Sequence, residues 1–335
     1  MRNFFIRGML CVFLWVPIGG SAEESFSDIF IFGDSLSDNG NLASVPGFEF
    51  LSMFPYDDGF SNGPRAVEVL AEGLDLDADP SLHLVRTFPL GTNFAVAGAR
   101  AVTLGVPPTI DLPTQIGSFL LSRNGVAPAD ALYMVFIGGN DIRDARDESD
   151  RRAAKAIIRE AVEGVAGAIR SLAGAGAERI LVANAPDIGA IPETRALGDQ
   201  KFAKRATKLT KSFNKRLAKA VRNAEWDFDL EIMEFDTFRF VRLIRKLGVR
   251  FGLFTNTDDA CFFTFLGKFN PECEFGKNFE NFVFFDEIHP TAKVHQLTGE
   301  AMLEVVLDDD DDDDDDHDDD YDRDNDNDND KRSAH

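Results

Sequence analysis

Residues that commonly bind metals or form covalent crosslinks are scarce in this chain. Its 335 residues include 3 cysteines and 5 histidines. There is no C-x-x-C motif and no cluster of cysteine and histidine, so the ligand sets typical of zinc sites are missing. We therefore expect no metal centre in this protein.

Positive charge is scarce as well. Lysine and arginine number 35 against 58 aspartates and glutamates, which gives a formal net charge of −23 at pH 7. Nucleic-acid binding needs clustered lysine and arginine against the phosphates, so we expect no nucleic-acid partner. Much of the negative charge lies in a tail, residues 308–335, where 17 aspartates outweigh three basic residues. Residues 1–307 therefore have the charge of an ordinary acidic protein.

The aspartate-rich tail has too little apolar surface to offset the entropy of ordering it, so we expect it to be disordered. Its segment "DRDNDNDND" offers carboxylate and amide oxygens, which calcium prefers. The EF-hand pattern also needs a central glycine and a distal glutamate, and both are missing. Loose association with divalent cations, or simple solvation, is expected in preference to a specific calcium site.

The apolar run near the N-terminus is too short to cross a membrane comfortably. It extends from Met9 to about Ile18, whereas a spanning helix needs about 20 residues. Arg2 and Arg7 precede it, and small residues then lead into two glutamates. This pattern predicts a secretory signal over residues 1–22, with an uncleaved anchor as the alternative. The mature protein would then be secreted or periplasmic.

Removal of such a signal leaves two cysteines, Cys261 and Cys273. In an exported protein an even number of cysteines close in sequence predicts a disulfide across a local loop. The alternative is a pair of free buried thiols.

The middle of the chain, residues 23–307, contains no proline- or serine-rich linker and no internal repeat, so we expect one domain. Short apolar runs alternate there with segments of helical spacing. The expected strands are residues 28–32, 131–137, 179–183, 230–234 and 282–285. The expected helices are residues 64–72, 115–122, 150–173, 198–224, 237–246 and 290–307. The alternation predicts a parallel sheet with helices on both faces, whose ligands bind beyond the carboxyl ends of the strands.

One serine stands at such a strand end. In "FIFGDSLSDNGN" an apolar strand stops at Gly33, and Ser35 follows between Asp34 and Leu36. A serine in this position is usually a helix cap. The alternative is a nucleophile, which would require a base, an orienting acid and oxyanion donors from elsewhere in the chain.

His289 is the candidate base. It occurs in "VFFDEIHPT", just after an apolar strand, with Asp286 three residues before it. A carboxylate on the same loop can bond one imidazole nitrogen and leave the other to act as a base. His83 lies in an expected loop and His295 in the last expected helix, so neither has such a partner. A surface turn remains the alternative for the D-x-x-H spacing on its own.

Two further segments offer hydrogen-bond donors for an oxyanion. The strand in "YMVFIGGNDI" ends in two glycines and then presents Asn140, whose side-chain amide donates without carrying charge. Gly98, in "GTNFAVAGARA", could bring its N–H close to a substrate. Each feature alone is also consistent with a turn or a packing glycine.

These four segments, taken in order, resemble the GDSL esterase/lipase family, whose members are also called SGNH hydrolases. The blocks "GDSL", "NFAVAGA", "GND" and "DEIH" span nearly the whole region between the signal and the tail. The resemblance implies a three-layer α/β/α sandwich with a flavodoxin-like parallel sheet. It also implies Ser35 as nucleophile, His289 as base and Asp286 as the acid that orients it. The oxyanion hole would consist of the Ser35 N–H, the Gly98 N–H and the Asn140 side chain.

One departure affects the second block, where many members have two glycines and this chain has Ala97 followed by Gly98. The second position is therefore assigned as the donor. The G-x-S-x-G elbow of the α/β-hydrolases is missing. The resemblance implies a carboxylesterase or lipase that works through an acyl-enzyme, without a metal or organic cofactor, on a small-molecule or lipid ester.

Other functions remain open at this point. A phospholipase, lysophospholipase or thioesterase would use the same residues, and a non-enzymatic acidic binding protein is a further alternative. Phenylalanine is concentrated late in the chain, with 14 of them between Glu234 and Phe285. These residues could simply pack a core and its loops, or they could form an apolar wall for an acyl chain. The second interpretation predicts a preference for medium or long acyl esters.

Overall fold

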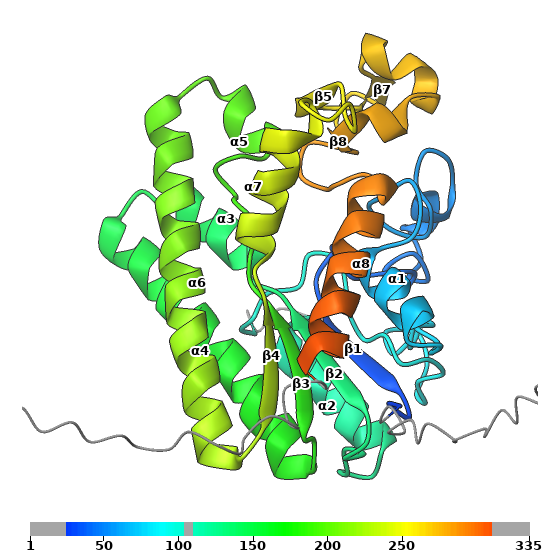
Figure 1. The fold of residues 1–335 in the computed structure, drawn as a ribbon, viewed down its shortest axis with the longest axis vertical. Coiled ribbons are helices and arrows are strands. Elements are labelled where there is room, and N and C mark those ends of the chain that lie inside the picture. The colour runs from blue at the N-terminus through cyan, green and yellow to red at the C-terminus, as the bar shows by residue number, and fades with distance from the viewer. Residues whose placement is uncertain (1–24, 104–109, 310–335) are drawn as a thin grey trace, which may run out of the picture.

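Four short parallel strands form the centre of the molecule (Figure 1). The computed structural model describes residues 25–103 and 110–309. Within these ranges the strands lie side by side in chain order and are parallel throughout. They are β1 (Ile29–Gly33), β2 (Leu132–Phe136), β3 (Arg179–Ala183) and β4 (Glu231–Phe235). Their carboxyl ends therefore lie at one edge of the sheet, as the sequence predicted.

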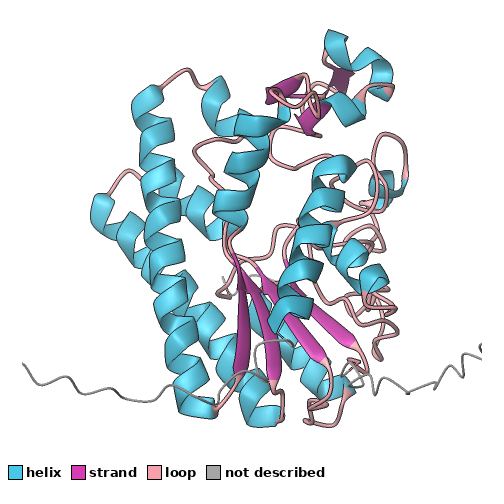
Figure 2. Ribbon diagram, in the orientation of Figure 1, coloured by secondary structure: helices cyan, strands magenta, loops and turns pink. Residues whose placement is uncertain are grey.

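Helices cover both faces of this sheet and give the expected three-layer α/β/α arrangement (Figure 2). Successive residues of a strand point to opposite faces, and they pack into two separate hydrophobic clusters. One cluster includes α2 (Leu112–Ser122), α3 (Gly139–Asp147), α4 (Arg151–Ala175) and α6 (Gln200–Phe228). The other includes α1 (Ala66–Gly73) and the second half of α8 (Ala292–Asp309). Because both of their faces are buried, β1, β2 and most of β3 read as continuous apolar runs in the sequence, whereas β4 at the edge of the sheet has exposed Glu231 and Glu234.

Sequence spacing located six helices and the four central strands to within a few residues, but it missed two helices. One is α3, whose sequence "GNDIRDARD" is mostly polar and charged, so its apolar face is too narrow to show a period. The other is α5 (Pro192–Ala196), which has only 5 residues. Helix α7 (Thr237–Gly248) lies where a helix was expected at residues 237–246.

The strand expected at residues 282–285 forms, but it does not belong to the central sheet. It is β8 (Phe282–Phe284), and it pairs in parallel with β5 (Asn256–Ala260) in a separate two-stranded sheet. The expectation of five strands in one sheet was therefore wrong. The physical reason is that residues 256–285 fold around a core of their own.

We call residues 256–285 the aromatic lobe. It also contains β6 (Phe262–Phe263), β7 (Lys268–Phe269) and the 3-10 helices η2 (Pro271–Gly276) and η3 (Phe279–Asn281). A further short 3-10 helix, η1 (Glu49–Ser52), lies in the segment after β1. The core of the lobe comprises the buried residues Cys261, Phe262, Cys273, Phe279, Phe282 and Phe285. Cys261 and Cys273 are paired as a disulfide with their Cα atoms 5.4 Å apart.

Several predictions lie outside the described residues. The signal at residues 1–22 is among them, so export and the boundary of the mature domain stay predictions. The tail lies outside them beyond Asp309, where α8 ends, so that helix includes the first two residues that we expected to be disordered. No helix in the described ranges 25–103 and 110–309 is long and apolar enough to cross a membrane.

Candidate active site

Ser35 lies in a tight turn at the carboxyl end of β1. The strand end is fixed by Gln115 of α2, whose side-chain oxygen accepts from the Gly33 N–H at 2.9 Å and whose amide donates to the Gly33 carbonyl at 2.8 Å. The Asp34 carbonyl then accepts from the N–H groups of Ser37 and Asp38, at 3.0 Å each. No helix begins at this turn, and the next helical segment, η1, starts only at Glu49, so Ser35 is not the helix cap that a serine after a strand suggests.

The three residues predicted as a triad meet in the structure. His289 Nε2 lies 2.8 Å from Ser35 Oγ, and His289 Nδ1 lies 2.7 Å from Asp286 Oδ2. An ionised carboxylate only accepts hydrogen bonds, so Nδ1 carries the proton and Nε2 is left to accept from the Ser35 hydroxyl. The Asp286 carboxylate also accepts from the His289 main-chain N–H at 2.7 Å. The acid therefore fixes both the ring and the backbone of the base.

His289 is buried together with Asp286, and one face of its ring contacts an aromatic side chain. Asp286 and His289 are buried, with 2% and 6% of their surfaces exposed. The Phe60 ring stacks on the imidazole, with ring centres 4.9 Å apart and planes inclined by 25°. The loop closes through the Phe285 N–H, which donates to the His289 carbonyl at 2.8 Å. His289 thus reaches Ser35 from the loop that follows the aromatic lobe, although β8 is not a strand of the central sheet.

The other two histidines of the described region do not contact this triad. His83 Nδ1 lies 2.7 Å from Ser81 Oγ, and burial lowers the pKa of the imidazole to about 4. His295 Nδ1 accepts from the Ala66 N–H at 3.2 Å, and burial lowers its pKa to about 3. Both imidazoles are therefore neutral at ordinary pH.

The segment with Gly98 is tied to the turn of Ser35 by one buried carboxylate. Asp38 accepts from the N–H groups of Gly40, Asn41 and Ala97 at 3.0, 2.8 and 2.8 Å. Gly98 has a φ of +86°, which L residues with a side chain rarely adopt. A Cβ at Gly98 would meet only Ile110 Cδ1, at 3.7 Å. The backbone conformation, and not crowding, therefore requires glycine at this position.

Asn140 follows the two glycines after β2, as expected, and it lies in the first turn of α3, a helix that the sequence did not predict. Its amide nitrogen donates to the Ala99 carbonyl at 2.9 Å, and Arg143 Nη1 donates to its side-chain oxygen at 3.2 Å. A guanidinium carries only donors, so the oxygen of Asn140 must face Arg143 and the NH₂ group must face the Gly98 segment. One of the two amide protons remains for another acceptor.

Sequence reasoning missed the ion-pair network that holds this asparagine. Arg143 pairs with Glu193 of α5 at 2.5 and 3.1 Å, and Arg146 Nη1 pairs with the same carboxylate at 2.6 Å. Burial alone would raise the pKa of Glu193, but hydrogen bonds and charge from the two arginines outweigh it and hold that pKa low. The spacing of Asn140 and Arg143, three apart on a helix, could have indicated the contact, but only if α3 had been predicted.

Two buried carboxyl groups near the triad have raised pKa values. Burial raises the pKa of Asp34 to about 6, against opposing hydrogen bonding from the Leu36 N–H and charge from His289 and Arg143. Burial likewise raises the pKa of Asp141 to about 7. Asp141 accepts from the Ala101 N–H at 3.1 Å, which ties the Gly98 segment to α3. The side chain of Asp34 accepts from the Leu36 N–H at 3.1 Å, which indicates that it shapes the turn.

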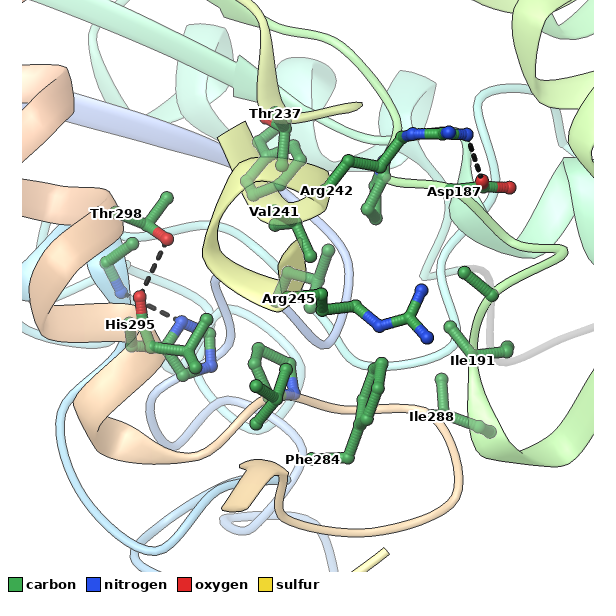
Figure 3. A pocket seen from close by; sticks show the side chains of 18 residues that line it. Asp187, Ile191, Thr237, Val241, Arg242, Arg245, Phe284, Ile288, His295 and Thr298 are labelled. Atoms are coloured by element: carbon green, nitrogen blue, oxygen red, sulfur yellow. Dashed lines mark hydrogen bonds and ion pairs between the residues drawn. The ribbon is translucent and has the colours of Figure 1, made fainter. Parts of the chain in front are cut away.

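A narrow, largely apolar cavity lies beside the loops that carry the triad (Figure 3). Its volume is small, about 50 Å³. Leu36 and Ile288, which adjoin Ser35 and His289 in sequence, contribute to its walls. His295 and Thr237 also line it, and neither His295 Nε2 nor Thr237 Oγ1 has a hydrogen-bond partner among the described residues. The described residues contain no group of three or more histidine, cysteine or acidic side chains that could hold a metal ion.

A parallel-sheet sandwich with a serine–histidine–aspartate line at the carboxyl edge of its strands defines a class of serine hydrolases. Comparison with known proteins identifies the family. A model of the GDSL-like lipase/acylhydrolase family matches residues 29–302, most of the chain. The chain therefore belongs to this family, and it is a carboxylic ester hydrolase.

Individual relatives are distant. Lipase 1 of Photorhabdus luminescens is 30% identical over 196 residues, which cover 57% of this chain and 27% of that protein. The phosphatidylcholine-sterol acyltransferase of Aeromonas hydrophila is 25% identical over 339 residues, which cover 90% of this chain and 96% of that protein. Among solved structures, Axe2, an acetylxylan esterase from Geobacillus stearothermophilus, aligns with a TM-score of 0.42 and 10% identity, over 86% of this chain and 96% of that one.

Replacement of Asp141 by asparagine should remove a pH-dependent cost of folding. Because burial raises its pKa to about 7, the native carboxyl stays protonated between about pH 4 and pH 7 while the unfolded one ionises. Stability from this group is thus highest below about pH 4 and falls as the pH rises through about 7. The stability of Asp141→Asn relative to the unchanged protein should therefore increase from pH 4 to pH 8 in urea unfolding. Asp227→Asn, at an exposed carboxylate of α6, is the control. The prediction is contradicted if the difference in unfolding free energy between Asp141→Asn and the unchanged protein varies with pH no more than it does for this control.

Proposed function

We propose that Ser35 is the nucleophile of this ester hydrolase and that hydrolysis proceeds through an acyl-enzyme. The observation that carries the proposal is the hydrogen-bonded line from Ser35 Oγ through the His289 ring to Asp286, with distances of 2.8 and 2.7 Å. His289 takes the proton from Ser35 as Oγ attacks the ester carbonyl, and Asp286 stabilises the imidazolium. The protonated His289 then gives its proton to the leaving alcohol. Water activated by the same imidazole hydrolyses the acyl-enzyme.

The negative oxygen of the tetrahedral intermediate would be held by three donors. They are the N–H groups of Ser35 and Gly98 and the free amide proton of Asn140. Two contacts between the Gly98 segment and α3 support this assignment, namely Asn140 to Ala99 at 2.9 Å and Ala101 to Asp141 at 3.1 Å. Because these contacts exist before substrate binds, the donors need little reorganisation in the transition state.

The nucleophile and the oxyanion donor can be tested with two substitutions. Ser35→Ala should remove nearly all hydrolysis of p-nitrophenyl esters, and Asn140→Ala should lower kcat about 10²–10³-fold while changing KM much less. A serine-directed phosphonate should label the unchanged protein at Ser35, as located by peptide mass spectrometry. Full activity in purified Ser35→Ala would overturn the assignment, and an Asn140→Ala enzyme with unchanged kcat would remove Asn140 from the oxyanion hole.

Arg143 should act through Asn140. Arg143→Met removes the donor at 3.2 Å that orients the Asn140 amide. Because an oxyanion donor is worth about 10²–10³-fold in kcat and only part of that should be lost, we expect kcat to fall on the order of tenfold. The same substitution in an Asn140→Ala background should then cost almost nothing, because the two effects are coupled. Arg170→Met, which breaks an exposed ion pair with Glu163 on α4, is the control. Full additivity of Arg143→Met and Asn140→Ala would show that Arg143 does not position this amide.

Apolar surface near the triad supports an ester with a sizeable acyl group. Four phenylalanines of the aromatic lobe are buried in its core, which favours the packing interpretation for those residues. Phe60 and Tyr56, in contrast, extend a series of ring contacts from His289, at 4.9 and 6.0 Å between successive ring centres. The cavity behind Leu36 and Ile288 offers a second apolar surface.

The acyl preference follows from these surfaces. Values of kcat/KM for p-nitrophenyl esters should rise from acetate to medium or long chains, because each buried methylene contributes about 0.8 kcal/mol. Activity confined to the acetyl ester would contradict this expectation. A parallel panel of lysophospholipids, phospholipids and thioesters separates the alternatives that share the same three residues. If the protein hydrolyses none of these substrates, the result would favour the alternative of a non-enzymatic acidic binding protein.

A further inference from the structure

Seven large apolar side chains are exposed on two segments that lie near the triad. We call this set the aromatic rim, and its members are Phe48, Phe50, Met53, Phe54, Phe265, Leu266 and Phe275. Five of the seven have more than 60% of their surface exposed. Single exposed apolar residues are common, but a contiguous group of this size usually marks an interaction site.

The two segments of the rim are packed against each other. The Phe54 ring lies 5.8 Å from Phe269 and 6.5 Å from Phe279, both in the aromatic lobe. Phe269 in turn lies 6.1 Å from Phe275. Figure 1 shows the segment after β1 beside the lobe, beyond the carboxyl ends of the central strands. The rim is therefore one surface at the end of the molecule where Ser35 lies.

Ring contacts connect this surface to the catalytic base without a break. Phe50 lies 5.7 Å from Tyr56, Tyr56 lies 6.0 Å from Phe60, and Phe60 stacks on His289 at 4.9 Å. The hairpin that carries Phe265 is tied to the same loop, because the Thr264 N–H donates to Glu287 at 3.2 Å. An apolar surface that begins at the base of an ester hydrolase fits an apolar medium that contains the ester.

The charges around the rim decide which medium it fits. Acidic side chains outnumber basic ones on residues 48–58 and 264–281. The acidic ones are Glu49, Asp57, Asp58, Glu272, Glu274 and Glu280, and the basic ones are Lys268 and Lys277. With a net charge of −23 for the chain, an anionic surface would be repelled. A trimethylammonium group is favoured instead, since aromatic faces and carboxylates both attract it.

We propose that the aromatic rim docks the protein on the surface of choline lipids, so that Ser35 and His289 face esters held in a bilayer or micelle. The inference rests on the proposed function and adds to it the physical state of the substrate. Rigid rings suit this role, since they bury much apolar area and lose few rotatable bonds on contact. Insertion of two or three of them supplies reversible binding, as for other interfacial proteins.

Vesicle flotation of the full chain tests the proposal. Ser35→Ala is used as the parent so that no lipid is consumed, with vesicles of phosphatidylcholine alone or with part of it replaced by phosphatidylserine. The rim variant adds Phe54→Ser and Phe265→Ser, at positions 71% and 96% exposed. The control variant adds Leu121→Ser and Trp226→Ser, at positions 80% and 89% exposed. These matched residues lie on α2 and α6, outside the rim.

The parent and the control variant should bind phosphatidylcholine vesicles, and the rim variant should bind at least about tenfold more weakly. Phosphatidylserine should weaken binding of the parent. No binding by the parent, or equal binding by the rim and control variants, overturns the proposal and leaves a protein partner as the occupant of the rim.

The same substitutions in the presence of Ser35 separate this inference from the proposed function. Hydrolysis of soluble p-nitrophenyl acetate should be unchanged in the rim variant, because neither substituted residue touches the triad. Soluble hydrolysis without vesicle binding would contradict the docking surface alone. Vesicle binding without any hydrolysis would contradict the proposed function alone. Loss of soluble hydrolysis in the rim variant would show that these residues support the site itself, and it would overturn a pure docking role.

Discussion

The geometry of the site depends on one buried carboxylate more than on any other group. Asp38 has 1% of its surface exposed, and it accepts hydrogen bonds from main-chain N–H groups of its own turn and from Ala97. Burial raises its pKa, and hydrogen bonds from these main-chain N–H groups and from that of Leu42 oppose the shift. Its contacts fix the distance between the turn of Ser35 and the segment of Gly98. Further hydrogen bonds run alongside these contacts, since the Val96 N–H donates to the Gly33 carbonyl at 3.2 Å and the Asn41 amide donates to the Ala95 carbonyl at 2.8 Å.

A second set of contacts joins the first turn of α3 to the Gly98 segment. Asn140 and Asp141, adjacent in the first turn of α3, both bond the main chain around Ala99 and Ala101. Arg143, one turn further along, orients the amide from its other side. Four consecutive residues of α3 thus contain Asn140, Asp141, which bonds the same neighbouring segment, and Arg143, which orients the Asn140 amide. A helix is well suited to this, because its side chains are held on a rigid backbone.

The sequence predicts the fold and the candidate site through two different signals. Buried parallel strands leave continuous apolar runs, which is why β1 to β4 were located closely from sequence. Ser35, His289 and Asp286 were found because their order along the chain matches a family pattern, although His289 comes from outside the central sheet. No periodicity could have shown that β8 pairs with β5, since the pairing depends on contacts within the aromatic lobe. Arg143 and Glu193 were missed because charged pairs on short helices leave no hydrophobic signal.

Ser35 is held in place mainly by hydrogen bonds around its turn, whereas His289 is held both by hydrogen bonds and by ring packing. Ser35 is fixed by hydrogen bonds to buried backbone around Gly33 and Asp38, which are directional and leave the turn little freedom. His289 is fixed at one end by Asp286 and at the other by packing of the aromatic lobe, to which Tyr56 and Phe60 contribute from the segment after β1. Packing is less directional than hydrogen bonding and permits small adjustments of position. The hydrogen bonds join the turn of Ser35, the Gly98 segment and the first turn of α3 into one unit. In the proposed mechanism His289 both accepts and returns a proton, and ring contacts connect it with the part of the molecule that carries the exposed rim.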